Sequence, residues 1–206
     1  MSEIKGIFKE ARNCKRCYGD VPIHVPRPDP KNGFENVKII FINERPGRIG
    51  TGESGYISFE NNDPSAHHFH ECFESLKISR TEIFISNACI CHPTYEGYID
   101  RAPSQKEIKN CHFWLERQLK AVNPKLIVTL GNIPLKSLKL FFKNSKQLKN
   151  FTLKNNVGVA ITDTKPWIYP LYHTSLRARL TRNTEQQKKD WLKIVGILKE
   201  IESKRL

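Results

Sequence analysis

The sequence has no long hydrophobic run. Its most apolar stretch, residues 39–42, is far shorter than the ~18 residues that suggest a membrane-spanning helix. Residues 1–5 do not form the apolar core of a signal peptide, and the chain shows neither an internal repeat nor a long linker. We therefore expect residues 1–206 to form a single domain that lies in the cytoplasm and has no membrane partner.

Acidic residues are comparatively few. The chain has 21 Asp and Glu against 34 Lys and Arg, which gives a net charge of +13. This excess favours a polyanionic partner, because Lys and Arg that neutralise phosphates release counterions. Charge alone does not distinguish DNA from RNA or from an anionic membrane surface, and a protein from a basic, lysine-rich proteome would show the same balance.

The six cysteines argue against a disulfide framework, because the cytoplasm keeps thiols reduced. Four of them are spaced as two separated pairs: Cys14 and Cys17, then Cys91 and Cys111. Four thiolates suit an iron–sulfur cluster and suit tetrahedral zinc equally well. Cys72 and Cys89 remain, and residues of this kind are more often small buried apolar side chains than reactive groups.

Strand-like and helix-like segments alternate along the chain. Apolar runs predict strands at residues 37–42, 83–85, 126–130 and 167–171, and helical spacing predicts helices at 3–13, 65–76, 104–122, 133–143 and 184–203. Residues 144–165 are expected to be a loop with a short strand near 158–161. The alternation predicts an α/β fold, a three-layer α/β/α sandwich with a central, mainly parallel four-stranded sheet.

Three polar motifs follow predicted strands at their carboxyl ends. They are residues 43–47, residues 87–91 and residues 173–175. Open α/β sheets bind ligands beyond the carboxyl ends of their strands. We therefore expect the three motifs to meet at one edge of the sheet.

The order of these motifs resembles a known family. Asn87 is followed by Cys91, then by Arg101-Ala102-Pro103, Glu107 and Cys111, and then by the phrase Asn123-Pro124-Lys125-Leu126-Ile127-Val128-Thr129-Leu130-Gly131. This pattern resembles family 4 of the uracil-DNA glycosylases, the iron–sulfur branch of that superfamily, over roughly residues 10–182. Several independent motifs occur in the family's order, which makes the resemblance specific.

The resemblance implies a [4Fe–4S] cluster held by Cys14, Cys17, Cys91 and Cys111. Spacing alone would also allow Cys89 in place of Cys91, but the Asn-x-x-x-Cys alignment favours Cys91. A cluster in this position would be structural and would fasten the N-terminal segment to the loop before Cys111.

The resemblance also implies a monofunctional hydrolase that removes uracil from DNA and leaves an abasic site. Glu44 would orient water or stabilise the cationic sugar, Asn87 would read the pyrimidine edge, and His173 would donate to the pyrimidine O2. Phe59 is the predicted stacking ring. Each has a structural alternative: a cap of the turn for Glu44, a loop-backbone contact for Asn87, and a core position for His173 or Phe59.

A basic segment follows His173. Four of its residues are predicted to contact DNA: Leu176, Arg177, Arg179 and Arg182. Arginines interleaved with leucines fit phosphate contacts plus an apolar wedge that fills the gap left by an extruded base. The alternative is an exposed basic start of a helix.

The chain departs from the family pattern at several positions. Asn43 replaces the first Gly of Gly-Glu-x-Pro-Gly, Arg45 stands where other branches place a catalytic Asp, and Thr174 replaces a Pro. Residues 95–98 are inserted, and residues 54–64 diverge most. A divergent subfamily is indicated, in which the damaged base could be uracil, hypoxanthine or xanthine.

Three functions therefore compete. The first is a DNA-repair glycosylase that acts as a monomer on DNA containing uracil or another deaminated base. The second is a non-catalytic iron–sulfur nucleic-acid-binding protein of the same fold, which Arg45 and the divergent loop favour. The third is a four-cysteine zinc or redox protein, which the motifs at Asn87 and His173 disfavour.

Overall fold

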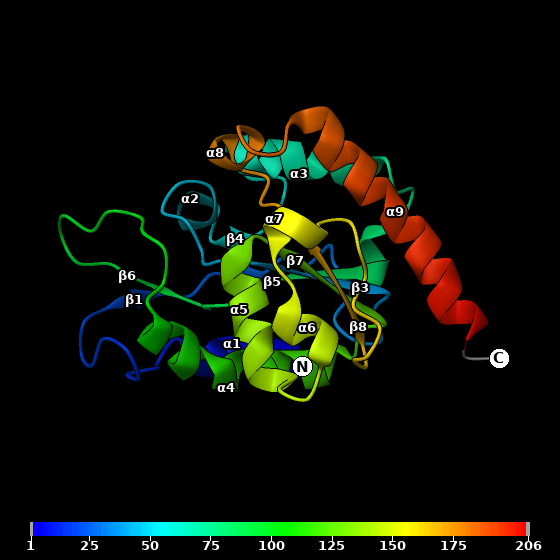
Figure 1. Ribbon diagram of the computed structural model, residues 1–206. Helices are drawn as coiled ribbons and strands as arrows, with labels where there is room; N and C mark the ends of the chain where they lie inside the picture. The colour runs from blue at the N-terminus through cyan, green and yellow to red at the C-terminus, as the bar shows by residue number, and fades with distance from the viewer. Residues whose placement is uncertain (1, 205–206) are drawn as a thin grey trace.

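The computed structural model describes residues 2–204. Its centre is a sheet of four parallel strands in the order β5-β3-β7-β8 (Figure 1). The strands are β3 (Ile39–Asn43), β5 (Ile83–Asn87), β7 (Leu126–Leu130) and β8 (Trp167–Leu171). Nearly every residue of these strands is buried, as expected for a parallel sheet that is covered on both faces.

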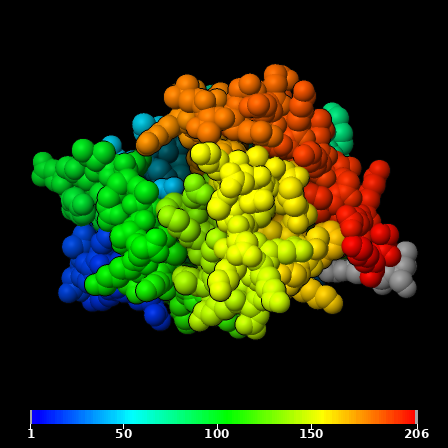
Figure 2. Space-filling view, in the orientation of Figure 1, coloured from blue at the N-terminus to red at the C-terminus, as the bar shows by residue number. Residues whose placement is uncertain are grey.

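Helices cover both faces of the sheet. On one side lie α1 (Glu3–Ala11), α4 (Gln105–Val122) and α5 (Asn132–Phe141), and on the other side lie α3 (Pro64–Glu74) and α9 (Thr184–Ser203) (Figure 1). The α/β/α sandwich predicted from the sequence is therefore confirmed. Figure 2 shows α9 running from the top of the molecule along one flank.

The long helices begin and end where local chemistry favours it. Ser104 accepts from the backbone N–H of Glu107, and Glu107 accepts in return from the N–H of Ser104, so the predicted capping box is present. Asn123 ends α4 in the left-handed conformation, with φ 46°. On α9, Trp191 is fully buried and stacks on Phe41 of β3 with a ring separation of 5.1 Å. This contact joins the last helix to the sheet.

The predicted loop at residues 144–165 is partly helical. It contains α6 (Lys146–Asn150) and α7 (Leu153–Asn156), and the predicted strand near 158–161 is reduced to one isolated antiparallel bridge between Ile161 and Ile168. These helices are four and five residues long, too short to show an apolar period. Ser145 starts α6 by accepting from the N–H of Leu148 at 2.9 Å.

Short elements connect the N-terminal segment to the loops around the sheet. β1 (Ile23–His24) pairs with β6 (His92–Pro93), and β2 (Arg27–Pro28) pairs with β4 (Tyr56–Ile57). The remaining short helices are α2 (Thr51–Ser54), the 3-10 helix η1 (Arg80–Glu82) and α8 (Leu176–Arg179). Among the residues that the structure describes, no helix combines the length and the apolar character that crossing a membrane requires.

Candidate active site

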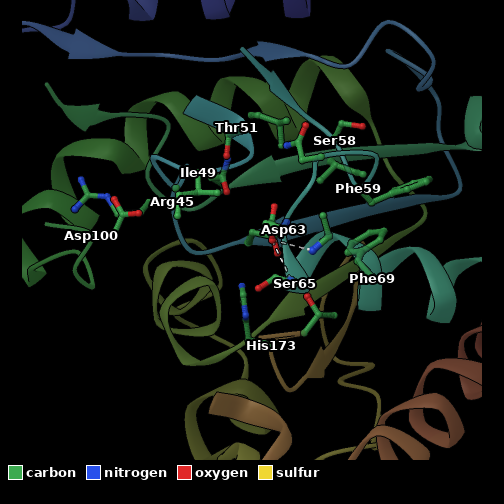
Figure 3. A pocket seen from close by; sticks show the side chains of 18 residues that line it. Arg45, Ile49, Thr51, Ser58, Phe59, Asp63, Ser65, Phe69, Asp100 and His173 are labelled. Atoms are coloured by element: carbon green, nitrogen blue, oxygen red, sulfur yellow. Dashed lines mark hydrogen bonds between the residues drawn. The ribbon is translucent and has the colours of Figure 1, made fainter. Parts of the chain in front are cut away.

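A cavity of about 290 Å³ opens at the carboxyl edge of the sheet (Figure 3). Its volume is close to the lower end of the ~300–1,000 Å³ typical of small-molecule sites. Segments far apart in the sequence line it: Asn43, Gly47, Phe59, Asp63, Asn87 and His173 among others. The expected meeting of three motifs at one sheet edge is thus seen in the structure.

Asn87 ends β5 and points into this cavity. It pairs with Asn43 across the parallel ladder, so the two amides stand side by side at the end of adjacent strands. The side chain of Asn87 is buried, and its Nδ2 has no hydrogen-bond partner within residues 2–204. Buried polar groups are nearly always paired. An unpaired amide donor on a cavity wall is therefore suited to bind a ligand.

His173 follows β8 and reaches toward Asp63 and Ser65 (Figure 3). Its Nδ1 accepts a hydrogen bond of 3.0 Å from the backbone N–H of Ser175. In the neutral ring the proton must then sit on Nε2, which makes Nε2–H a donor. Burial lowers the pKa of His173, and the nearby Asp63 carboxylate only partly opposes this shift. The ring is therefore a neutral donor at pH 7.

Phe59 lines the cavity but is packed within a cluster of aromatic rings. It is 3% exposed and stacks on Phe69 at 5.2 Å, and the guanidinium of Arg80 lies 4.3 Å from its ring centre. The core position considered as the alternative describes these contacts well. A stacking role toward a base stays a prediction.

Glu44 does not line the cavity with Asn87 and His173. It is half-buried directly after β3, and its backbone oxygen accepts from the N–H of Cys89 at 3.0 Å. Burial raises the pKa of Glu44, and Arg45 partly counteracts the effect. The structure therefore places three of the four residues predicted to act on substrate, Asn87, His173 and Phe59, on the cavity wall and leaves Glu44 outside it.

Sequence reasoning missed several polar residues of the cavity wall, among them Asn43, Asp63 and Thr174. Asn43 and Thr174 had been noted only as departures from the family pattern. Asp63 precedes Pro64, and an Asp followed by Pro at the first helical position is a recognisable start signal of a helix. That signal would have located the start of α3 but not the place of Asp63 on the cavity wall.

Most of the cysteines gather between α4, the end of α1 and the loop after β5. The thiol of Cys111 lies within hydrogen-bonding contact of three others: Cys17, Cys89 and Cys91. Cys14 accepts from the indole N–H of Trp114 at 3.3 Å, one helical turn beyond Cys111. Cys72 lies elsewhere, on α3 beside His68.

This set of soft sulfur donors fits an iron–sulfur cluster chemically. No group of three or more His, Cys, Asp or Glu side chains within residues 2–204 is arranged to hold a single metal ion. Cys89 and Cys91 both contact Cys111, so the preference for Cys91 as a cluster ligand stays a prediction.

Arg45 links the cavity to the cysteine region. Its side chain is 6% exposed, and Nη2 donates to the hydroxyl of Tyr18 at 2.8 Å and to the backbone oxygen of Cys91 at 3.1 Å. Glu107 accepts from the same nitrogen at 3.3 Å and from Arg101 at 2.7 Å. Burial alone would raise the pKa of Glu107, but hydrogen bonds from Arg101, Tyr18 and Ser104 lower it to about 2.

The basic segment after His173 forms α8 and the turn behind it. Leu176 is 61% exposed and Leu180 is 89% exposed, so both leucines of the segment stand out from the surface. Arg177 is exposed. Arg179 donates to the backbone oxygen of Pro64 at 3.5 Å, and Arg182 makes two hydrogen bonds of 2.8 Å to the buried carboxylate of Asp190.

The Arg182 contacts predict different roles for two arginines of this segment. Arg182→Ala would leave the Asp190 carboxylate, 4% exposed, without its partner and should lower the free energy of unfolding by about 1–3 kcal/mol. Arg177→Ala should change stability by less than about 0.5 kcal/mol, because the side chain is exposed. Urea unfolding of both variants measures this, and equal stability of the two would contradict it.

Comparison with known proteins agrees with the geometry. The model of the uracil DNA glycosylase superfamily matches residues 30–196, most of the chain. This chain belongs to the uracil-DNA glycosylase superfamily. The expected hydrolase class, a DNA glycosylase, is thereby confirmed at the level of the family.

Relatives within the superfamily are distant. A type-4 uracil-DNA glycosylase from Archaeoglobus fulgidus is 24% identical over 94% of this chain and 92% of its own length. A type-4 enzyme from Sulfurisphaera tokodaii is 29% identical over 74% of this chain and 63% of its own length. A type-5 uracil-DNA glycosylase from Pyrobaculum aerophilum is 25% identical over 72% of this chain and 66% of its own length. The resemblance to family 4 is therefore confirmed, and the chain is a divergent, family 4-like member of the superfamily.

Proposed function

We propose that this chain is a monofunctional uracil-DNA glycosylase of base-excision repair. It hydrolyses the bond between uracil, or another deaminated base, and deoxyribose in DNA and leaves an abasic site. The observation that carries the proposal is the cavity in which the unpaired Nδ2 of Asn87 and the Nε2–H of His173 face one space. The basic helix α8 follows His173 of the cavity wall in the chain and lies beside α3, where Arg179 contacts Pro64 (Figure 1).

Base recognition follows from the two side chains. An enzyme that acts on a base must take it out of the stack and read its hydrogen-bonding edge. The amide of Asn87 offers one donor and one acceptor, which match a carbonyl and the ring N–H of uracil. Because Nδ2 has no protein partner within the described chain, the base satisfies a donor that is otherwise buried and unpaired.

Bond cleavage places negative charge on the leaving base. As the bond from C1′ to the base nitrogen breaks, the electron pair moves to the base and its O2 becomes more negative. The Nε2–H of His173 is suited to donate to that oxygen, and a preorganised donor in a water-poor site lowers the barrier to charge formation. Because burial keeps the His173 ring neutral, the ring can donate this hydrogen bond without a counter-ion to balance a positive charge.

DNA contact is assigned to the surface around α8. Leu176 and Leu180, both strongly exposed, are suited to enter the space that the base vacates, and Arg177 is suited to bind a phosphate. Arg179 and Arg182 were also predicted to bind phosphates. They are instead hydrogen-bonded to Pro64 and Asp190, so we assign them the role of holding the α8 segment in position against the rest of the protein. The enzyme is proposed to act as a cytoplasmic monomer.

A [4Fe–4S] cluster is proposed at Cys14, Cys17, Cys91 and Cys111, whose sulfur donors suit it. When bound, it would supply a structural crosslink between the segment after α1, the loop after β5 and helix α4. Anaerobically purified protein should then be brown and absorb visible light, which a zinc site would not do. Colourless, zinc-containing protein would exclude the cluster.

The activity is tested with a single-stranded and a double-stranded oligonucleotide that contain one uracil. Wild-type protein should generate abasic sites that alkali cleaves, and a panel with hypoxanthine and xanthine in place of uracil reports base preference. Binding without cleavage over the whole panel would support the non-catalytic alternative, which the position of Glu44 outside the cavity favours. No binding and no cleavage would contradict both.

His173→Ala is expected to lower the rate of uracil excision about 10²-fold, because one donor to the leaving base is lost. The pH dependence gives an independent check. Since burial lowers the pKa of His173, the ring stays neutral below the ~6.5 of an exposed histidine, and excision by the wild type should not slow between pH 7 and about 6. Single-turnover rates at saturating enzyme measure both. A wild-type rate in the variant would exclude the assigned role.

A further inference from the structure

Hydrolysis requires a group that handles the attacking water, and neither residue of the first motif is placed for it. Glu44 lies outside the cavity wall. Arg45 carries a positive charge and is held by Tyr18, Cys91 and Glu107. Asn87 and His173 therefore supply hydrogen-bond donors to the base. The reaction at the sugar still needs a carboxylate that orients water or balances a cationic sugar.

Two carboxylates line the cavity wall, those of Asp100 and Asp63. Asp100 is engaged by the backbone N–H and the side chain of Arg48, so the candidate is Asp63. It is the N-cap of α3, and its Oδ1 accepts from the backbone N–H groups of Ser65 at 2.9 Å and Ala66 at 3.0 Å. Both donors fix Oδ1 and orient the whole group. Its second oxygen, Oδ2, makes no hydrogen bond within the part of the chain that is described. Because the helix cap uses one oxygen only, the other is available to a ligand.

Gly50, which precedes α2, packs close to that second oxygen. Gly50 has a φ of +71°, and a Cβ built at this position would lie 2.4 Å from Oδ2 of Asp63. Any side chain at position 50 would therefore collide with the carboxylate, and only a glycine allows this close approach. The Gly50 backbone thus holds the carboxylate on one side, and a small molecule such as water can reach it from the cavity that Asp63 lines.

Asp63 and His173 act on the same space. Figure 3 shows both side chains on the cavity, with His173 reaching up toward Asp63 and Ser65. The carboxylate is close enough to oppose the effect of burial on the pKa of His173. A base held by Asn87 and His173 would thus place its sugar within reach of the wall that carries Asp63.

We propose that Asp63 is a catalytic residue of the glycosidic hydrolysis, in addition to its role as helix cap. This proposal rests on the proposed glycosylase function. Oδ2 of Asp63 holds the water whose oxygen forms the new bond to C1′. As the bond from C1′ to the base breaks, its electron pair leaves with the base, and Oδ2 takes one proton from the water. The sugar becomes a C1′ hydroxyl, the base anion takes a proton from solvent, and Asp63 returns its own proton to solvent.

The test is Asp63→Asn, which removes the charge but preserves the cap, because Asn, Asp and Ser are about equal at an N-cap. The variant should keep the melting temperature of the wild type within about 3 °C and bind a uracil-containing oligonucleotide with less than a threefold change in Kd. Its single-turnover excision rate should fall about 10²-fold, the lower end of general-base effects. Asp163→Asn is the matched control, since Asp163 accepts from the N–H of Gln147 at the start of α6, far from the cavity. It should excise at the wild-type rate.

Each outcome is decisive. An Asp63→Asn protein that is folded and excises uracil at the wild-type rate overturns the proposal. If Asp63→Asn does not fold, Asp63→Ser takes its place, and if neither folds, Asp63 is only a structural residue and the proposal is wrong. Failure of the wild type to excise any base of the panel would instead overturn the glycosylase function itself, which separates the two conclusions.

Discussion

Asn87→Ala is expected to lower the rate of uracil excision about 10³-fold, at the upper end of the effect of removing a preorganised donor, because the amide supplies both a donor and an acceptor to the base edge. The same change should leave the protein at least as stable as the wild type. The Nδ2 of Asn87 is buried without a partner in the described chain, so its removal relieves an unpaired polar group and leaves no other group stranded. Single-turnover kinetics and urea unfolding measure the two effects.

Asn144→Ala is the control for this experiment. Asn144 is an exposed residue between α5 and α6, away from the cavity, so its replacement should change neither rate nor stability. The combination expected for Asn87→Ala, lost activity with retained or increased stability, is typical of a residue kept for function at the expense of packing. A strongly destabilised Asn87→Ala protein would indicate instead that the amide supports the loop backbone, the structural alternative.

Glu107→Ala is expected to lower the free energy of unfolding by about 3–5 kcal/mol, the usual effect of removing one partner from a buried ion pair. Both side chains of the pair with Arg45 are almost fully buried, at 6% and 7% exposure. Without Glu107 the Arg45 guanidinium keeps its hydrogen bonds to Tyr18 and Cys91 but loses its counter-charge. Glu116→Ala, which breaks a surface pair with Lys120 on the same helix, should change stability by less than about 0.5 kcal/mol.

The pH dependence of this effect follows from the pKa of Glu107, about 2 in the folded protein. It lies below the ~4.3 of an unfolded glutamate, so the ionised form stabilises the fold above pH ~4.3. That contribution decreases as the pH falls toward 2. The stability difference between wild type and Glu107→Gln should therefore be constant near neutrality and shrink in acid. A difference independent of pH would show that the charge of Glu107 does not contribute to stability through Arg45 and Arg101.

Much of the fold could be read from local patterns. The four strands are short buried apolar runs, and α4 and α9 carry both an apolar period and a capping residue at their start. Such signals involve only a few neighbouring residues, so they can be recognised without knowledge of the tertiary structure. By contrast, α6 and α7 depend on contacts such as that of Ser145 with Asp163, 18 positions away, and were predicted as a loop.

The candidate site was only partly predictable for the same reason. Asn87 and His173 were found because each follows a strand directly, and the edge of a parallel sheet brings such residues together. Glu44 also follows a strand, yet successive side chains along an extended backbone point to opposite sides, so Asn43 faces the cavity and Glu44 does not. Asp63 and Gly50 lie in the divergent loop, where no period or motif fixes the path of the chain.

The sequence by itself determined the fold class, the positions of the long elements, the likeness to the uracil-DNA glycosylases and three of the residues that line the cavity: Phe59, Asn87 and His173. These follow from apolar periodicity, capping chemistry and motif order, which are all properties of neighbouring residues. Only the tertiary structure decided that Arg182 is tied to Asp190 and that Phe59 is packed among aromatic rings. It also decided that Asp63 and Asp100, and not Glu44, bring carboxylates to the cavity wall. Each of these features depends on which distant segments come into contact. The path of a loop and the partner of a buried charge are determined by packing and desolvation over the whole molecule, which no short stretch of sequence specifies.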